Sequence, residues 1–121
     1  MTAGVVAIVE DDAAMRKSIE RFLQANDFET IAYASAEEFL NCPLADNTTG
    51  LVLDIHLPGM SGIELRRRLL AAGSKLPVVF ITAHDDKATH DEALAAGCVA
   101  FLQKPFDPCR LTEALQQAMK A

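Results

Sequence analysis

The chain has 121 residues, half of them hydrophobic, which is enough for a compact fold without disulfide or metal support, and we expect one domain over residues 1–121. Its net charge of −6 argues against a nucleic-acid-binding surface, which requires clustered Lys and Arg to replace counterions. The N-terminal segment has no basic n-region and no long apolar span, so we expect a cytoplasmic protein without a membrane partner.

The first third of the chain alternates strand and helix patterns. Residues 5–9 form an apolar run that predicts a buried strand ending at an acidic turn, residues 10–12. Apolar residues then recur at helical spacing, at Met15, Ile19, Phe22 and Leu23. Residues 28–33 alternate apolar and polar side chains, as expected of a strand at a sheet edge. Ser35 opens the sequence SAEE, a capping box that predicts a second helix with residues 39–40 on its buried face.

The middle of the chain contains a buried strand that ends on a carboxylate. After a polar loop, residues 41–50, the apolar residues 51–53 predict a strand buried on both faces, with Asp54 at its C-terminal end. A turn follows, marked by Pro58, Gly59 and Gly62. A helical pattern covers residues 62–72, and Gly73 stands in the position of a C-cap glycine.

The last third repeats the alternation. Residues 77–82 predict a fully buried strand that ends on a hydroxyl, and residues 85–96 predict a helix. That helix has only Leu94 as a large aliphatic side chain, so it should be weakly held and able to shift. Residues 99–102 predict a fifth strand, and residues 107–108 open the last helix. Its core-facing stripe comprises Leu111, Ala114, Leu115, Ala118 and Met119.

Five strands alternating with five helices predict an α/β fold of the flavodoxin-like, doubly wound type. Right-handed crossovers then favour a five-stranded parallel sheet of order 2-1-3-4-5 with helices on both faces. Arg66, Arg67 and Arg68 lie within a helical pattern, and we interpret them as a solvated face. The three cysteines lack close C-x-x-C spacing, so we expect reduced thiols, with Cys98 the best candidate for burial.

In this topology the polar residues at the strand ends converge on one cleft. They are Glu10, Asp11, Asp54, Thr82 and Lys104. Two unit charges about 4 Å apart repel by roughly 4 kcal/mol at an effective dielectric of 20, so clustered carboxylates call for a cation. Oxygen ligands without chelating Cys or His favour Mg²⁺. An aspartate can then act as nucleophile toward a phosphoryl group, whose oxygens the cation, the ammonium and the hydroxyl would stabilise.

Each of these residues also has an ordinary structural interpretation. Thr82 fits a strand end, Lys104 fits a solvated surface charge, and the acidic turn fits a helix N-terminus that interacts favourably with the helix dipole. Polar residues stand at the ends of all the strands that are expected to meet, and this coincidence favours a phosphoryl-transfer site over separate structural roles.

The motifs IVEDD, LDIHLPGMSG, FITAH and FLQKPF identify a resemblance that covers essentially the whole chain. With them the chain resembles the receiver domain of two-component response regulators. The resemblance implies that Asp54 is the phosphoacceptor and that Thr82 and Lys104 bind the phosphoryl group. It also implies that Mg²⁺ (or Mn²⁺) is held by Glu10, Asp11, Asp54 and the backbone carbonyl of His56. Phe101 would be the switch aromatic, and the Lys104–Pro105 bond would be cis.

The resemblance also implies partners. A sensor histidine kinase would donate the phosphoryl group, and phosphorylation could drive formation of a homodimer. The motifs GVVAIVEDD, LPGMSGIEL and ITAHDD are most similar to those of regulators with a helix-turn-helix output. DNA would therefore be contacted only through an output domain outside these 121 residues. The protein would not be an enzyme, although it would assist its own phosphorylation and dephosphorylation.

Glu10 departs from the usual pattern of the family, and two histidines near the expected phosphoryl group add a further feature. The family usually has Asp where this chain has Glu10, and we hypothesise that Mg²⁺ still binds through Asp11, Asp54 and a directly reaching or water-mediated Glu10. His56 and His84 flank the expected phosphoryl group, where they would modulate water access or be ordinary exposed histidines.

Three other functions remain open. A phosphohydrolase of the haloacid-dehalogenase type usually has a second acid two residues after its nucleophile, where this chain has His56, and the chain lacks room for a cap. A flavodoxin-like binding protein would need a glycine-rich phosphate loop, which is not evident. A pseudo-receiver that acts only as an interaction module is consistent with Glu10, but not with the retained Asp54, Thr82 and Lys104.

Overall fold

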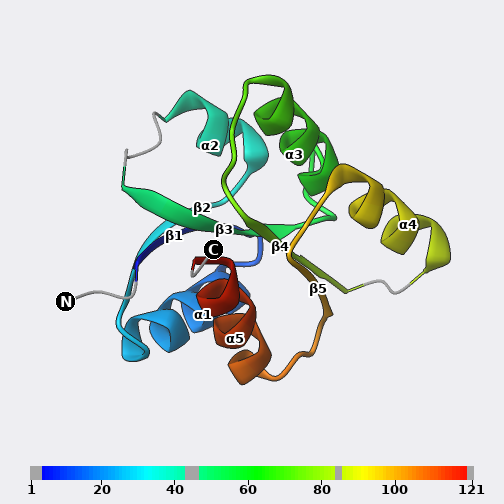
Figure 1. Ribbon diagram of the computed structural model, residues 1–121. Coiled ribbons are helices and arrows are strands. Elements are labelled where there is room, and N and C mark those ends of the chain that lie inside the picture. Colours follow the sequence, from blue (N-terminus) through cyan, green and yellow to red (C-terminus); the bar gives the residue numbers. More distant parts are fainter. Residues whose placement is uncertain (1–3, 43–46, 84–85, 120–121) are drawn as a thin grey trace.

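The computed structural model describes residues 4–42, 47–83 and 86–119. Its strands form one parallel sheet in the order β2-β1-β3-β4-β5, as predicted. The strands are β1 (Gly4–Val9), β2 (Phe28–Tyr33), β3 (Thr48–Asp54), β4 (Val78–Thr82) and β5 (Ala100–Gln103). The helices are α1 (Ala13–Ala25), α2 (Ala36–Asn41), α3 (Gly62–Ala71), α4 (Lys87–Ala96) and α5 (Pro108–Met119). Figure 1 shows α1 and α5 on one face of the sheet and α2, α3 and α4 on the other.

Alternate residues of the central strands fill two cores, one on each face of the sheet. Val6 and Ile8 of β1 pack with buried side chains of α1 and α5, whereas Ala7 and Val9 pack with α2, α3 and α4. Both faces of β1, β3 and β4 are therefore apolar, which explains their near-continuous hydrophobic sequences. The alternating strand β2 lies at an edge, as its pattern predicted. Leu111 and Leu115 of the last helix are buried, as expected.

Strand β3 begins earlier than expected. Residues 48–50 belong to the strand and residue 41 belongs to α2, so the prediction of a loop over residues 41–50 was wrong at both ends, and residues 43–46 lie outside the described residues. Thr49 explains the extension, because its hydroxyl accepts from the Val5 amide (3.0 Å) and donates to the Val5 carbonyl (3.2 Å). These bonds replace regular pairing where the register between β1 and β3 shifts.

Helix α4 is held by alanines rather than by its one large aliphatic residue. Ala93 and Ala96 are buried, whereas Leu94 is 57% exposed. The helix begins at Lys87, with the Asp86 side chain accepting from the Thr89 amide (2.7 Å), so the predicted helix over residues 85–96 was wrong at residue 86, and residue 85 lies outside the described residues. Because alanine side chains bury little area, the apolar contribution to holding α4 is small, as expected from the sequence.

The basic cluster does not form a single solvated face. Arg66 is only 9% exposed, and its guanidinium donates to the carbonyl oxygens of Leu76 (2.8 Å) and Gly97 (3.0 Å). Burial lowers the pKa of Arg66, although the neighbouring Cys98 acts in the opposite direction. Arg67 and Arg68 have exposed side chains. The prediction was wrong for Arg66 because backbone carbonyls in loops can accept the hydrogen bonds of a buried guanidinium. Sequence patterns treat arginine as a surface residue and do not reveal such acceptors.

Local signals at helix ends and at the cysteines agree with the structure. The Ser35 hydroxyl accepts from the Glu38 amide (3.0 Å), and Gly73 follows the C-cap of α3 with φ of 85°. Cys98 is half-buried, whereas Cys42 and Cys109 are exposed, and all are free thiols. Among the described residues, every helix is too short or too polar to cross a bilayer.

Candidate functional site

The polar residues predicted to converge do meet at the carboxyl edge of the sheet. Glu10 directly follows β1, Asp54 ends β3, and Thr82 ends β4, while Lys104 comes directly after β5. Glu10, Asp54 and Thr82 are buried, whereas Asp11 is exposed. Parallel strands bring their carboxyl ends to the same edge, so residues up to 94 positions apart in the chain become neighbours.

Three carboxylates form the acidic part of the site. One carboxylate oxygen each of Glu10, Asp11 and Asp54 lies within 4.8 Å of the other two. The donor set consists of oxygen atoms, which suits a hard divalent cation such as Mg²⁺. These residues therefore fit the metal implied by the resemblance, and Glu10 is placed to contribute despite its longer side chain.

Lys104 bridges two of the three carboxylates. Its ammonium nitrogen lies 2.5 Å from Glu10 Oε1 and 3.1 Å from Asp54 Oδ2. Burial alone would lower the pKa of Lys104, but the hydrogen bonds and charges of Glu10 and Asp54 raise it instead. Lys104 therefore carries a full positive charge at neutral pH and partly neutralises the cluster.

The Glu10 carboxyl has a raised pKa. Burial is the main cause, and the neighbouring Asp54 raises it further, whereas Lys104 and the Asp12 amide lower it. Arg16 donates from Nη1 to the Glu10 carbonyl oxygen (2.9 Å). No motif in the sequence indicates this contact, since an arginine in the first turns of a helix has no distinctive pattern around it.

Asp12 has a structural position beside the site. Its side chain caps α1 by accepting from the amides of Ala14 (2.9 Å) and Met15 (3.1 Å). Its amide donates to Glu10 Oε2 (3.3 Å). The Asp12 carboxylate is therefore occupied as an N-cap, whereas the carboxylate cluster comprises Glu10, Asp11 and Asp54.

The loop after β3 passes directly against Asp54. The His56 amide donates to Asp54 Oδ1 (3.1 Å), and the Gly62 amide donates to the Ile55 carbonyl (3.0 Å). A Cβ atom at Gly62 would lie 2.2 Å from the Asp54 carbonyl oxygen, so only glycine fits there. The His56 backbone thus lies beside Asp54, as a metal-ligand role requires. His84 lies outside the described residues.

Thr82 and Phe101 lie on the neighbouring strands β4 and β5. The Lys104 amide donates to the Thr82 carbonyl (2.7 Å), which joins the ends of β4 and β5. The half-buried ring of Phe101 stacks on the His90 imidazole of α4, with centroids 4.6 Å apart and planes 13° apart. The Lys104–Pro105 peptide bond is cis, the isomer that the resemblance implies. The sequence contains no pattern that predicts the stacking of His90 on Phe101.

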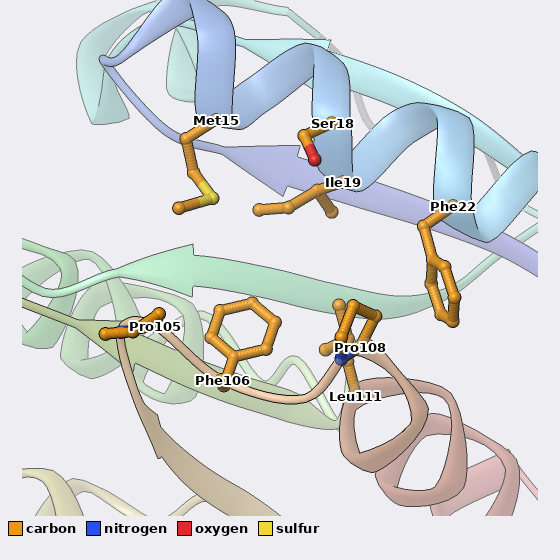
Figure 2. Close-up of a pocket in the computed structure, with 8 residues that line it drawn as sticks. All are labelled: Met15, Ser18, Ile19, Phe22, Pro105, Phe106, Pro108 and Leu111. Atoms are coloured by element: carbon orange, nitrogen blue, oxygen red, sulfur yellow. The ribbon is translucent and has the colours of Figure 1, made fainter.

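An apolar groove begins next to Lys104, between α1 and the segment that leads into α5. Figure 2 shows its lining side chains facing each other across the gap. They are Met15, Ser18, Ile19 and Phe22 on one side and Pro105, Phe106, Pro108 and Leu111 on the other. None of these side chains is ionisable, so the groove adds no acid, base or metal ligand to the carboxylate cluster.

A family model and similar curated proteins point to the same protein family. The model of the response regulator receiver domain family matches residues 6–116. Nodulation protein W of Bradyrhizobium diazoefficiens is 38% identical over 117 residues, which cover 97% of this chain and 52% of that protein. Transcriptional regulatory protein FixJ of Rhizobium meliloti is 38% identical over 118 residues, with coverage of 98% and 58%. The chain thus spans about half the length of these relatives.

Solved structures agree with the sequence relatives. The crystal structure of a response regulator receiver protein from Pseudoalteromonas atlantica superposes with a TM-score of 0.90 at 28% identity. The superposition covers 96% of this chain and 97% of that one. The likeness therefore extends over the whole fold and not only over the site motifs.

Proposed function

Because the chain belongs to the response regulator receiver domain family, we propose that it is a phosphorylation-activated signalling switch in which Asp54 accepts a phosphoryl group from a partner histidine kinase. The observation that carries the proposal is the position of the Lys104 ammonium, 3.1 Å from Asp54 Oδ2 within a cluster of three carboxylates. Receiver domains act as signalling switches rather than as metabolic enzymes.

The residues of the site suit phosphoryl transfer. A carboxylate oxygen of Asp54 attacks the phosphorus, a new O–P bond forms, and the N–P bond to the kinase histidine breaks. Lys104, already hydrogen-bonded to Asp54, can donate to a phosphoryl oxygen, and the Thr82 hydroxyl at the neighbouring strand end can donate to another. Mg²⁺ held by Glu10, Asp11, Asp54 and the His56 carbonyl would supply further positive charge for the developing negative charge.

The added charge on Asp54 would then shift the balance between two conformations. Moving such a balance from 1:99 to 99:1 requires about 5.5 kcal/mol of differential stabilisation. Thr82 and Phe101 would couple the phosphoryl group to the surface formed by α4, β5 and α5. Support comes from α4, which buries alanines and stacks through His90 on Phe101, so that its displacement exposes little apolar area.

The surface formed by α4, β5 and α5 would control an output domain or a partner protein in transcription. The relatives are about twice as long as this chain, and one of them is named a transcriptional regulatory protein. Contact with DNA would be made by such an output domain, and phosphorylation would favour a homodimer. We place the protein in the cytoplasm, where a histidine kinase presents its phosphorylated domain.

The first test is phosphorylation of the chain by a small-molecule donor. Incubation with acetyl phosphate and Mg²⁺ should increase the intact mass by one phosphoryl group, and Asp54→Asn should abolish the adduct. Chelation of the metal with EDTA should also prevent the reaction. If the wild-type chain acquires no adduct, the switch is excluded and a pseudo-receiver interaction module becomes the better description.

A further inference from the structure

We propose that Glu37 of α2 is a positioning residue for the phosphoacceptor site, because its carboxylate holds the loop that places the His56 backbone against Asp54. The inference rests on the proposed function of Asp54 and adds a residue from a helix that contributes no group to the chemistry. Three observations support it: how the loop is closed, what Glu37 contacts, and how firmly α2 is packed.

The loop between β3 and α3 is closed tightly at its base. The Gly62 amide donates to the Ile55 carbonyl (3.0 Å), and the backbone at Gly62 lies directly against the Asp54 carbonyl. The Ile55 and Leu57 side chains are buried in the core beneath α2 and α3. His56 lies between these two anchors, with its side chain exposed and its amide bonded to Asp54 Oδ1.

Glu37 holds the outer turn of the same loop. Its Oε2 accepts from the Met60 amide (2.9 Å). Gly59 has φ of 75°, and a Cβ atom there would lie 2.6 Å from the same Oε2, so the turn is packed against the carboxylate. The Met60 hydrogen bond is the largest cause of a lowered pKa for Glu37. Glu37 is therefore ionised at neutral pH, in the form that accepts this bond best.

The helix that carries Glu37 gives the loop a firm support. Ser35 caps α2, and the Phe39 side chain is buried, with its ring edge to face on Tyr33 at a centroid distance of 5.1 Å. The loop is thus fixed at its base by the sheet and at its outer turn by α2. Loss of the Glu37 bond would free the segment between Leu57 and Met60 and broaden the positions of the His56 backbone.

Glu38 provides a matched control. It lies next to Glu37 in the first turn of α2, is also exposed, and has the same favourable interaction with the helix dipole. Its backbone amide makes the Ser35 cap, a bond that survives truncation of the side chain. Comparison of Glu37→Ala with Glu38→Ala therefore separates the contact with Met60 from the effects of charge and helix stability.

The test compares the wild-type chain with Glu37→Ala, Glu37→Gln and Glu38→Ala. Mg²⁺ affinity is measured by calorimetry, amide exchange at Met60 by NMR, and the initial rate of phosphorylation over a range of acetyl phosphate concentrations by intact mass. Loss of one hydrogen bond to a carboxylate predicts Mg²⁺ binding and phosphorylation weaker by about 3- to 10-fold in Glu37→Ala, with faster exchange at Met60. Glu37→Gln retains an acceptor oxygen and should stay within about twofold of wild type.

Two results would overturn the role of Glu37. One is equal Mg²⁺ affinity and phosphorylation rate in Glu37→Ala and Glu38→Ala, and the other is a Glu37→Gln variant as impaired as Glu37→Ala. Urea unfolding of each variant controls for a general loss of stability. If the wild-type chain takes up no phosphoryl group, the proposed function fails, but Mg²⁺ affinity and Met60 exchange still decide whether Glu37 positions the loop.

Discussion

At the scale of single residues, Glu10 has two partners that compete for it. Its carboxylate belongs to the acidic cluster that suits a cation, yet Oε1 already contacts the Lys104 ammonium at 2.5 Å. A cation that coordinates this oxygen would share it with the ammonium, and the two positive charges would repel each other. Glu10 stands where the family usually has Asp, and its contact with Lys104 gives this departure a physical consequence that can be tested.

This competition predicts the effect of shortening Glu10. In Glu10→Asp the shorter carboxylate should withdraw from Lys104, which reduces the repulsion between the ammonium and the cation, and Mg²⁺ should bind about tenfold more tightly, or ~1.4 kcal/mol. Calorimetric titration of both proteins measures the change. Asp11→Asn, which removes an exposed carboxylate, should instead weaken binding. Identical Mg²⁺ affinity and coordination in wild type and Glu10→Asp would remove Glu10 from the site.

At the scale of secondary-structure elements, α4 is held at one end by a residue of α3. The Arg66 guanidinium donates to the carbonyl of Gly97, just after α4, and to the carbonyl of Leu76, before β4. Two buried alanines supply the apolar contact of α4, and an exposed pair, Arg67 and Glu92 at 4.0 Å, adds little. The hydrogen bond from Arg66 therefore holds the C-terminal end of α4 more firmly than its apolar contacts alone would.

Removal of the Arg66 anchor should be costly. Arg66→Met keeps an unbranched apolar stem but leaves two carbonyl oxygens without their donor, so the free energy of unfolding should fall by about 2–3 kcal/mol. Arg67→Met removes a mostly exposed guanidinium and should cost less than about 0.5 kcal/mol. Urea unfolding at neutral pH measures both. Equal losses in the two variants would show that burial of Arg66 contributes nothing to the anchor.

At the scale of the whole molecule, the protonation of the buried Glu10 carboxyl links folding to pH. The pKa of Glu10 is raised by burial and by Asp54, so the folded state binds this proton more tightly than the unfolded state. The associated stability is fully present below the ordinary pKa of 4.5 and is lost as pH rises through the folded pKa. Lys104 does not change this trend, because its raised pKa stays above its ordinary value of 10.5.

This linkage predicts the pH dependence of stability. In EDTA, the free energy of unfolding of the wild-type chain should decrease as pH rises from 4.5 into the neutral range, as measured by urea unfolding. Glu10→Gln should reduce this slope and be the more stable protein at neutral pH. Glu38→Gln, which changes an exposed carboxyl, serves as the control. A slope unchanged in Glu10→Gln would assign the pH dependence to other groups.

The sequence by itself determined the order and type of the elements, the parallel sheet and its strand order, and the convergence of Asp54 with Glu10, Asp11, Thr82 and Lys104. These features follow from local signals, since apolar runs, helical spacing, caps and glycine turns each reflect a few neighbouring residues. Strand ends then meet because parallel topology leaves no other arrangement.

Only the tertiary structure decided the exceptions to the predicted burial and which pairs of side chains touch. Arg66 lies inside and Leu94 outside, Lys104 bridges Glu10 and Asp54, and Glu37 reaches Met60 across 23 positions of the chain. Such contacts depend on how helices are placed over the sheet to within about an ångström. Hydrogen bonds form only when donor and acceptor are placed with this precision. The periodicity of apolar residues along the chain does not specify positions so closely.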